Sequence, residues 1–188
     1  MRRSKFAEAR GPAEAGGESD DKTVQKTVEA TAVRLLARRE HSVEELRRKL
    51  KGRDLPEPTI ETVLARLQAK RLVSDDRFVA SFIHHRAQRG QGPVRIRAEL
   101  RQQGIAADTA DSAIDIIEID WVTSAQAVRQ RKFGSALPRA MAERAKQARF
   151  LQYRGFSSDQ IRAALKSDVG SYDSATDADA GLDPDPEV

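Results

Sequence analysis

Residues 100–114 read LRQQGIAADTADSAI. The same pattern occurs 50 residues earlier, as LKGRDLPEPTIETVL at 50–64, and 51 residues later, as LQYRGFSSDQIRAAL at 151–165. Each copy begins with a leucine, has a glycine within its first five residues, and carries apolar residues at positions 6, 11, 14 and 15. Because self-similarity at a fixed period marks a repeat architecture, we predict three copies of one structural unit.

The apolar spacing within each copy indicates helices. Steps of three and four residues place side chains on one helical face, and the glycine marks a turn between two helices. Upstream of the leucine, Leu46 matches Ile96, but Gln147 occupies the corresponding place in the third copy. No segment alternates with the period of a strand. We therefore predict an all-α fold of three tandem three-helix, helix-turn-helix-like repeats that form an elongated, curved array.

Capping residues mark where the predicted helices begin. Ser42 with Glu45 and Ser157 with Gln160 have the spacing of capping boxes, and Asp108 is a predicted N-cap. Pro58 and Pro93 suit first helical turns. The map has nine helices, at 24–39, 42–51, 57–70, 74–89, 93–103, 108–118, 120–132, 138–154 and 157–167.

The ends of the chain differ from its body. Residues 1–22 hold two Gly/Pro clusters and no apolar period, and residues 168–188 are acidic with two prolines, so both are predicted to be disordered. The body then divides into three predicted units, at 23–72, 73–118 and 119–167.

Charge is distributed unevenly along the chain. The net charge is +4, and the tail from residue 168 holds seven acids and no Lys or Arg, so removing it leaves +11 on residues 1–167. Such a basic body is attracted to polyanions such as DNA, RNA or an acidic protein face. The alternative is that the Arg-rich helices are simply solvated. Charge alone leaves both interpretations open.

Basic residues recur in every unit and are the binding candidates. They could form one stripe along the array that suits a nucleic acid backbone or a nucleoprotein filament, although unpatterned solvation is the alternative. Besides the site candidates, unit three contains the basic residues Arg129, Arg131, Lys132, Arg139, Arg144 and Lys146. The site candidates are Arg38, Arg39, Arg47, Arg48, Arg86, Arg89, Arg95, Arg97, Arg101, Arg149 and Arg154.

Several classes of function lack support in the sequence. The absence of cysteine excludes disulfides and argues against structural zinc. His84 and His85 are adjacent and would point about 100° apart on a helix, so they cannot share one metal at one face. No catalytic constellation is present, so we expect no enzyme, no metal and no cofactor. No apolar run is long enough to span a membrane and no secretory signal is present, which predicts a cytoplasmic protein.

Other motifs have simpler structural interpretations. Asp75 and Asp76 are expected in the first turn of a helix, where they could fix the angle between units one and two. The segment 90–93 (GQGP) is expected to end one helix and begin the next. We expect Trp121 to pack in a core or between units, and Phe150 and Tyr153 to be core or half-buried residues.

Four motifs in this order and spacing resemble the RecX family of regulatory proteins. They are RREHS at 38–42, LVSDDRF at 72–78, RGQGPVRI at 89–96 and RGFSSDQI at 154–161, and together they place the resemblance over about 28–167. Two positions depart from the family pattern. Arg71 stands where a glycine is usual, and Ser74 stands where Asp or Asn is common.

The resemblance implies three tandem three-helix units that bind RecA and the groove of its filament. Such a protein would block filament growth or promote disassembly, and so restrain strand exchange, ATP hydrolysis and SOS co-protease activity during DNA repair. It would act as a monomer, with weak direct binding to single- or double-stranded DNA. The alternative is a helix-turn-helix transcriptional regulator, although the third helix of each unit begins with acidic or neutral residues, which is wrong for entering a DNA groove.

Overall fold

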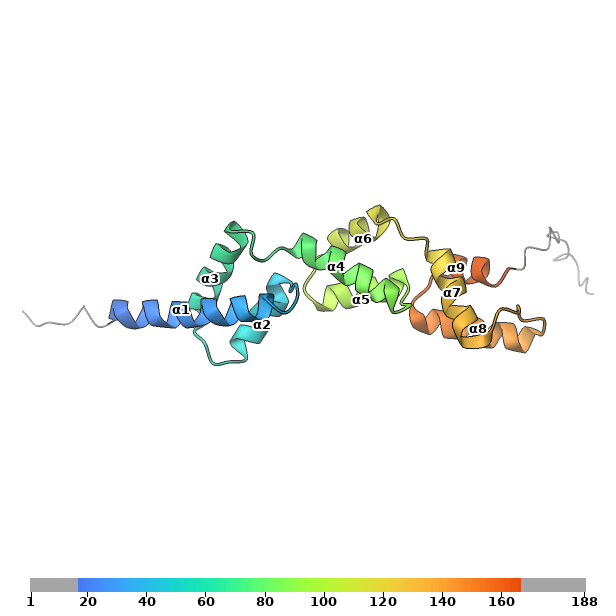
Figure 1. Cartoon of the computed structure of the whole chain (residues 1–188), viewed down its shortest axis with the longest axis horizontal. Helices are drawn as coiled ribbons and strands as arrows, with labels where there is room; N and C mark the ends of the chain where they lie inside the picture. Colours follow the sequence, from blue (N-terminus) through green and yellow to red (C-terminus); the bar gives the residue numbers. More distant parts are fainter. Residues whose placement is uncertain (1–16, 167–188) are drawn as a thin grey trace, which may run out of the picture.

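The computed structural model describes residues 17–166, and every regular element within them is an α-helix. The first unit contains α1 (Gly17–Leu36), α2 (Val43–Lys51) and α3 (Glu57–Ala69). The second contains α4 (Asp75–Gln88), α5 (Pro93–Gln102) and α6 (Ala107–Ile116), and the third contains α7 (Trp121–Phe133), α8 (Met141–Arg154) and α9 (Ser158–Ala164). The predicted all-α architecture of three tandem units is confirmed (Figure 1).

The first helix differs most from its predicted position. It begins at Gly17, so the prediction of disorder over residues 1–22 is wrong for 17–22. Residues 1–16 and the predicted acidic disordered tail at 168–188 lie outside the described range.

The predicted helix starts are partly confirmed. Ser157 and Gln160 form a complete capping box, with each side chain bonded to the other residue's backbone N–H. Ser42 accepts from the backbone N–H of Glu45 at 3.0 Å, but the second half of that predicted box is missing because the Glu45 carboxylate binds Arg39. Asp108 is not an N-cap, since α6 begins one residue earlier and Asp108 lies in its first turn.

Each unit has its own hydrophobic core. The repeated leucines Leu50, Leu100 and Leu151 are fully buried, one in each core. Gln147 is also buried, so the polar residue at the divergent position still faces inward. Trp121 packs against both the second and the third core, which confirms its predicted packing role.

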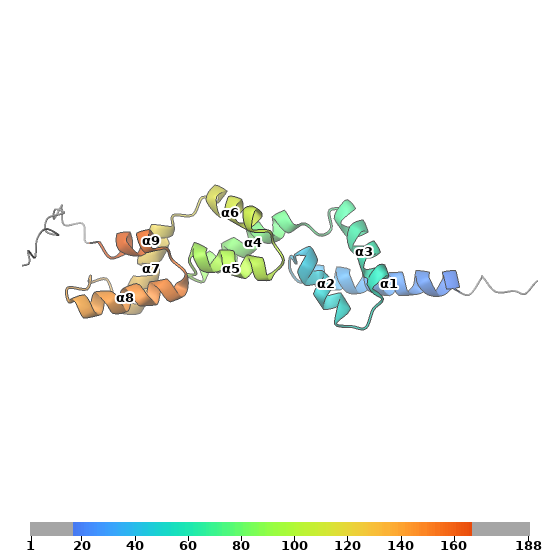
Figure 2. The same cartoon turned by 180° about the vertical axis from the view of Figure 1, so that it is seen from behind.

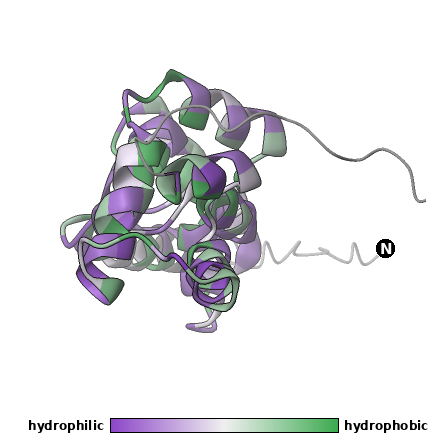
Figure 3. Ribbon diagram, turned by 90° about the vertical axis from the view of Figure 1, so that its right-hand side faces the viewer, coloured by the Kyte–Doolittle hydropathy of each residue, from purple (hydrophilic) through white to green (hydrophobic). Residues whose placement is uncertain are grey.

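The three units follow one another along an elongated molecule (Figures 1 and 2). Helix α1 lies at one end and α9 lies in the unit at the other end. Seen along the long axis, the helices carry hydrophilic and hydrophobic residues side by side (Figure 3), as helices with one buried face require. Because the molecule is elongated, the contacts at the two junctions between units determine the shape of its surface.

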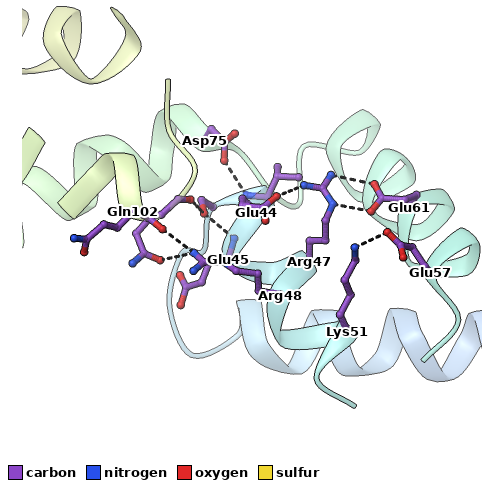
Figure 4. A network of polar contacts seen from close by, with 12 residues as sticks. Glu44, Glu45, Arg47, Arg48, Lys51, Glu57, Glu61, Asp75 and Gln102 are labelled. Carbon is purple, nitrogen blue, oxygen red and sulfur yellow. Dashed lines mark hydrogen bonds and ion pairs between the residues drawn. The ribbon is translucent and has the colours of Figure 1, made fainter. Parts of the chain in front are cut away.

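The first junction joins the N-terminal end of α2 to the C-terminal end of α5. The hydroxyl of Ser42, the N-cap of α2, donates to the carbonyl oxygen of Gln103 at 2.6 Å. The N–H of Val43 donates to the Asp75 carboxylate at 2.9 Å (Figure 4). This contact confirms the structural role predicted for Asp75. The backbone N–H of Val43, which the start of α2 leaves free, thus finds its acceptor in the next unit.

The second junction repeats this geometry with different residues. The N–H of Gly92, the N-cap of α5, donates to the carbonyl of Arg154 at 2.8 Å, and Val94 donates to Gly155 at 3.0 Å. The backbones approach so closely that a Cβ on Gly92 would overlap the Gly155 carbonyl oxygen. The segment 90–93 therefore ends α4, begins α5 and also contacts unit three.

Candidate polyanion-binding surface

Five of the eleven candidate arginines are paired with carboxylates. The guanidinium of Arg97 lies 2.7 Å from Asp111 and 3.2 Å from Asp115, which joins α5 to α6. Arg86 and Arg95 both contact Glu99, at 2.8 and 2.9 Å. The other two paired candidates are Arg39 and Arg47. Neutralised in this way, these five contribute less to the attraction of an external polyanion than their number suggests.

Arg47 is the most constrained of these cations. It binds Glu44 on its own helix and Glu61 on α3, and so ties α2 to α3 (Figure 4). The hydrogen bonds with Glu61 and Glu44 raise the pKa of Arg47, and the hydrogen bond from Arg47 lowers the pKa of Glu61. Its geometry makes Arg47 a structural residue.

Two further candidates connect neighbouring units. Arg48 donates to the carbonyl oxygen of Gln102 at 3.1 Å and to the side-chain oxygen of Gln103 at 3.3 Å. Arg154 donates to the carbonyl of Arg89 at 3.3 Å, and its guanidinium lies 5.4 Å from the ring centroid of Phe150. Both arginines stiffen a junction as well as carrying charge.

The remaining four candidates are exposed on the surface. Within residues 17–166, their side chains make no hydrogen bond or ion pair. Arg131 and Lys132, in the last turn of α7, are equally exposed and unpartnered within that range, although they are not among the eleven candidates. The four are Arg38, Arg89, Arg101 and Arg149.

A small cavity at the junction of units two and three gathers four cations. Arg89, Arg131, Lys132 and Arg154 line it, together with Val128 and Phe150, and its volume is about 180 Å³. No acidic residue lines this cavity. The elements that supply the cations are the C-terminal ends of α4, α7 and α8, and the fold brings them together from three separate parts of the sequence.

A larger groove of about 410 Å³ lies between units one and two. Its apolar wall contains Phe78 and Phe82, whose ring centroids are 5.5 Å apart, and Arg86 lies 4.7 Å over the Phe82 ring. Arg89 lines the groove as well as the smaller cavity. The two hollows are therefore neighbours on one surface.

A buried acidic residue organises the other edge of the groove. Glu45 binds Arg39 at 2.5 Å and His41 at 3.0 Å. Burial is the largest single influence on Glu45 and opposes its ionisation, but the hydrogen bonds and positive charges of Arg39 and His41 together outweigh burial and lower the pKa of that carboxyl. Burial also lowers the pKa of His41, against the attraction of Glu45. These residues hold the loop between α1 and α2, so Arg39 acts in the fold as well as on the surface.

The sequence pattern of basic residues was misleading for Arg129. This side chain is only 2% exposed, and it donates to the carbonyls of Ser135 and Ala136 at 3.1 and 3.0 Å. It holds the segment that follows α7. The sequence does indicate that Arg129 is buried, because Arg129 follows Ala125 and Val128 at the spacing of the buried face of α7. The prediction that Tyr153 is a core or half-buried residue is also wrong, since Tyr153 is 82% exposed.

Residues 17–166 contain no group of three or more His, Asp or Glu side chains placed to hold a metal ion. None of the helices between Gly17 and Ala164 is both long and apolar enough to cross a bilayer.

Comparisons with known proteins identify the repeat. Family models described as the first, second and third three-helix domains of RecX match residues 30–67, 74–114 and 118–165. These matches follow the order of the three units in the structure.

Relatives of similar length support the match. A protein named regulatory protein RecX from Halorhodospira halophila is 44% identical over 146 residues, which cover 78% of this chain and 91% of that protein. One from Pseudomonas fluorescens with the same name is 47% identical over 138 residues, which cover 73% and 89% of the two chains.

Solved structures share the fold. A crystal structure of RecX from Lactobacillus salivarius superposes with a TM-score of 0.65 at 22% identity, and covers 78% of this chain and 96% of its own. A second crystal structure, of a regulatory protein RecX, gives 0.64 at 24% identity over 76% and 72% of the two chains. The three domain matches and the 44–47% identical relatives together show that this chain belongs to the RecX family of regulatory proteins.

Proposed function

We propose that this RecX-family regulator binds RecA and its filament on single-stranded DNA, and mainly inhibits recombinase, ATPase and co-protease activity. It would act in the cytoplasm as a monomer, and so regulate DNA repair and the SOS response. The observation that carries the proposal is the match of all three RecX domains, in order, to one elongated array. A repeat array presents an extended surface, which suits a long polymeric partner.

The distribution of charge supports this proposal. Exposed cations without partners in the described range occur in all three units, for example Arg38, Arg101 and Arg149. Charges spread along an elongated body favour a partner with charge spread along its length, such as a nucleoprotein filament.

The alternative, a helix-turn-helix transcriptional regulator, has less support. The first turns of α3, α6 and α9 contain Glu57, Asp108 and Asp159. An acidic first turn repels phosphate where a recognition helix would have to enter the groove.

Co-sedimentation with RecA filaments across a salt series tests the proposal. We expect the full chain to sediment with RecA assembled on single-stranded DNA, and to bind free single-stranded DNA more weakly and with stronger dependence on salt. Stoichiometric protein should also lower RecA-driven ATP hydrolysis and strand exchange. Unchanged ATPase and strand exchange, with no co-sedimentation, would refute the proposal, and a strong consensus selected from a random duplex library would favour the transcriptional alternative.

A further inference from the structure

The cavity between units two and three has the composition of an anion site. Its four cations, Arg89, Arg131, Lys132 and Arg154, converge with no carboxylate on its lining. Arg86 and Arg95, by contrast, share Glu99 as a counter-charge. Like charges gathered without a counter-charge repel one another, so an anion that enters this cavity relieves the repulsion.

The cations are also free to bind. Arg89, Arg131 and Lys132 make no side-chain hydrogen bond or ion pair with residues 17–166. Only Arg154 is engaged, through the Arg89 carbonyl and the Phe150 ring. That engagement fixes its guanidinium at the cavity wall, and a planar guanidinium held in place is suited to phosphate oxygens. The cavity therefore offers one oriented and three adaptable donors.

The cations complement the helix dipoles at the ends of α4, α7 and α8, which is a structural reason for basic residues there. That explanation requires a cation at each helix end. It does not require three ends to converge on one hollow. The volume of about 180 Å³ is roughly six times the ~30 Å³ that one water molecule occupies in the liquid, so the hollow has room for a group larger than water.

The neighbouring groove indicates a polymer rather than an isolated ion. Because Arg89 lines both hollows, an occupant longer than one phosphate can extend from the cavity toward the groove between units one and two. There it meets the half-buried Phe82 and the guanidinium of Arg86 over its ring, while Phe78 supports Phe82 from the core. Aromatic rings and guanidinium planes are surfaces on which unpaired bases stack.

We propose that this cavity binds a backbone phosphate of single-stranded nucleic acid, with a neighbouring base directed into the groove at Phe82. The assignment deepens the proposed function and rests on it for its biological setting, because it places a nucleic acid contact at the junction of units two and three. The phosphate chemistry itself can be tested without RecA.

The test compares two charge-matched double variants of the full chain. R131Q/K132Q removes two cavity cations, whereas R101Q/R149Q removes two exposed, unpartnered arginines that do not line the cavity. Arg154 is left intact because it also links units two and three. Thermal melts followed by circular dichroism should show that both variants fold as the unsubstituted chain does.

Fluorescence anisotropy with a labelled 20-nucleotide oligothymidine, titrated at several salt concentrations, measures binding. We expect R131Q/K132Q to weaken oligonucleotide binding on the order of tenfold, because it removes charge-assisted hydrogen bonds. The slope of log affinity against log salt concentration should also fall by about 0.7 for each phosphate that is no longer neutralised. R101Q/R149Q should weaken binding much less. Equal weakening by both variants would mean diffuse charge and would overturn the proposal.

Two further arms identify the source of the phosphate and separate this proposal from the proposed function. The affinity for duplex DNA of equal length should depend less on Arg131 and Lys132 than the affinity for the single strand does. If inorganic pyrophosphate binds in a cavity-dependent way while the oligonucleotide does not, the nucleic acid assignment is wrong. Cavity-dependent oligonucleotide binding without RecA co-sedimentation would refute only the proposed function, whereas RecA co-sedimentation with indistinguishable variants would refute only the cavity.

Discussion

Ser42 and Gln103, 61 residues apart in the chain, are joined by a 2.6 Å hydrogen bond from hydroxyl to carbonyl. The same hydroxyl accepts from the N–H of Glu45. One side-chain oxygen therefore caps α2 and fixes the position of the next unit, which couples a local helix start to the arrangement of the array.

Replacing Ser42 should therefore cost more than an ordinary cap. We expect Ser42→Ala to lower the free energy of unfolding by about 2–3 kcal/mol, because it removes a cap worth about 1 kcal/mol and leaves the Gln103 carbonyl without its donor. Ser74→Ala is the control, since Ser74 caps α4 through a 3.3 Å bond within its own unit. Equal urea midpoints for the two variants would show that the contact with Gln103 adds no stability.

A methyl group at Gly92 should disturb the second junction. Gly92 has an ordinary φ of −87°, so Gly92→Ala introduces no backbone strain, but its Cβ would overlap the Gly155 carbonyl oxygen. We expect a loss of about 1–3 kcal/mol from overpacking and a change in the radius of gyration by small-angle scattering.

Gly134→Ala is the matched control for this junction. Gly134 has a φ of +87° but open space around its Cβ, so its replacement strains the backbone without a clash between units. It should lower stability and leave the radius of gyration unchanged. A change in size for Gly134→Ala, or none for Gly92→Ala, contradicts the role given to this contact.

Stability should fall with acidity through His41. Burial lowers the pKa of this imidazole below its ordinary value of 6.5, so just below that pH the unfolded chain binds a proton at His41 more readily than the folded chain does. Acidification below about pH 6.5 therefore favours unfolding. The lowered pKa of Glu45 acts in the same direction below its ordinary value of 4.5.

Urea titrations at pH 7.5, 6.5, 5.5 and 5.0 measure this dependence. His41→Gln should flatten the loss of stability between pH 6.5 and 5.0. His85→Gln, at an exposed position, should leave the profile of the unsubstituted chain intact. A flattened profile in His85→Gln alone would show that His85, and not His41, causes the dependence of stability on pH.

Replacing Arg47 tests whether an arginine paired with carboxylates serves the fold and not the binding of a partner. Since Glu44 and Glu61 hold its guanidinium, Arg47→Met should cost about 0.5–1 kcal/mol of stability, as partly exposed ion pairs do. Affinity for the RecA filament should stay within about twofold in co-sedimentation, because a paired cation contributes little external charge. A large loss of filament affinity at unchanged stability would place Arg47 in the interface instead.

The buried Arg129 should be among the most sensitive cations. Arg129→Met leaves the carbonyls of Ser135 and Ala136 without donors, and we expect a loss of about 2–4 kcal/mol. Limited proteolysis should then cut the segment at 134–140 faster. The exposed neighbour Arg131 is the control, and Arg131→Met should change neither measurement.

The sequence was sufficient for the cores but not for the ion pairs. The spacing around Leu50, Leu100 and Leu151 predicts the fold because burial on a helix depends on position within that helix, and all three are fully buried. The clamp of Arg97 by Asp111 and Asp115 depends on how α5 and α6 pack, which no local spacing encodes. The basic cavity likewise required helix ends from three places in the chain.

The two junctions also give the molecule a direction. At each of them the C-terminal end of one unit's second helix meets the N-terminal end of the preceding unit's second helix, so that α8 is followed by α5 and α5 by α2. The array is thus polar, with two unlike ends. On a polymer that is itself polar, such an array has one orientation that fits and a reversed one that does not, so the junctions could decide which way round the protein is bound.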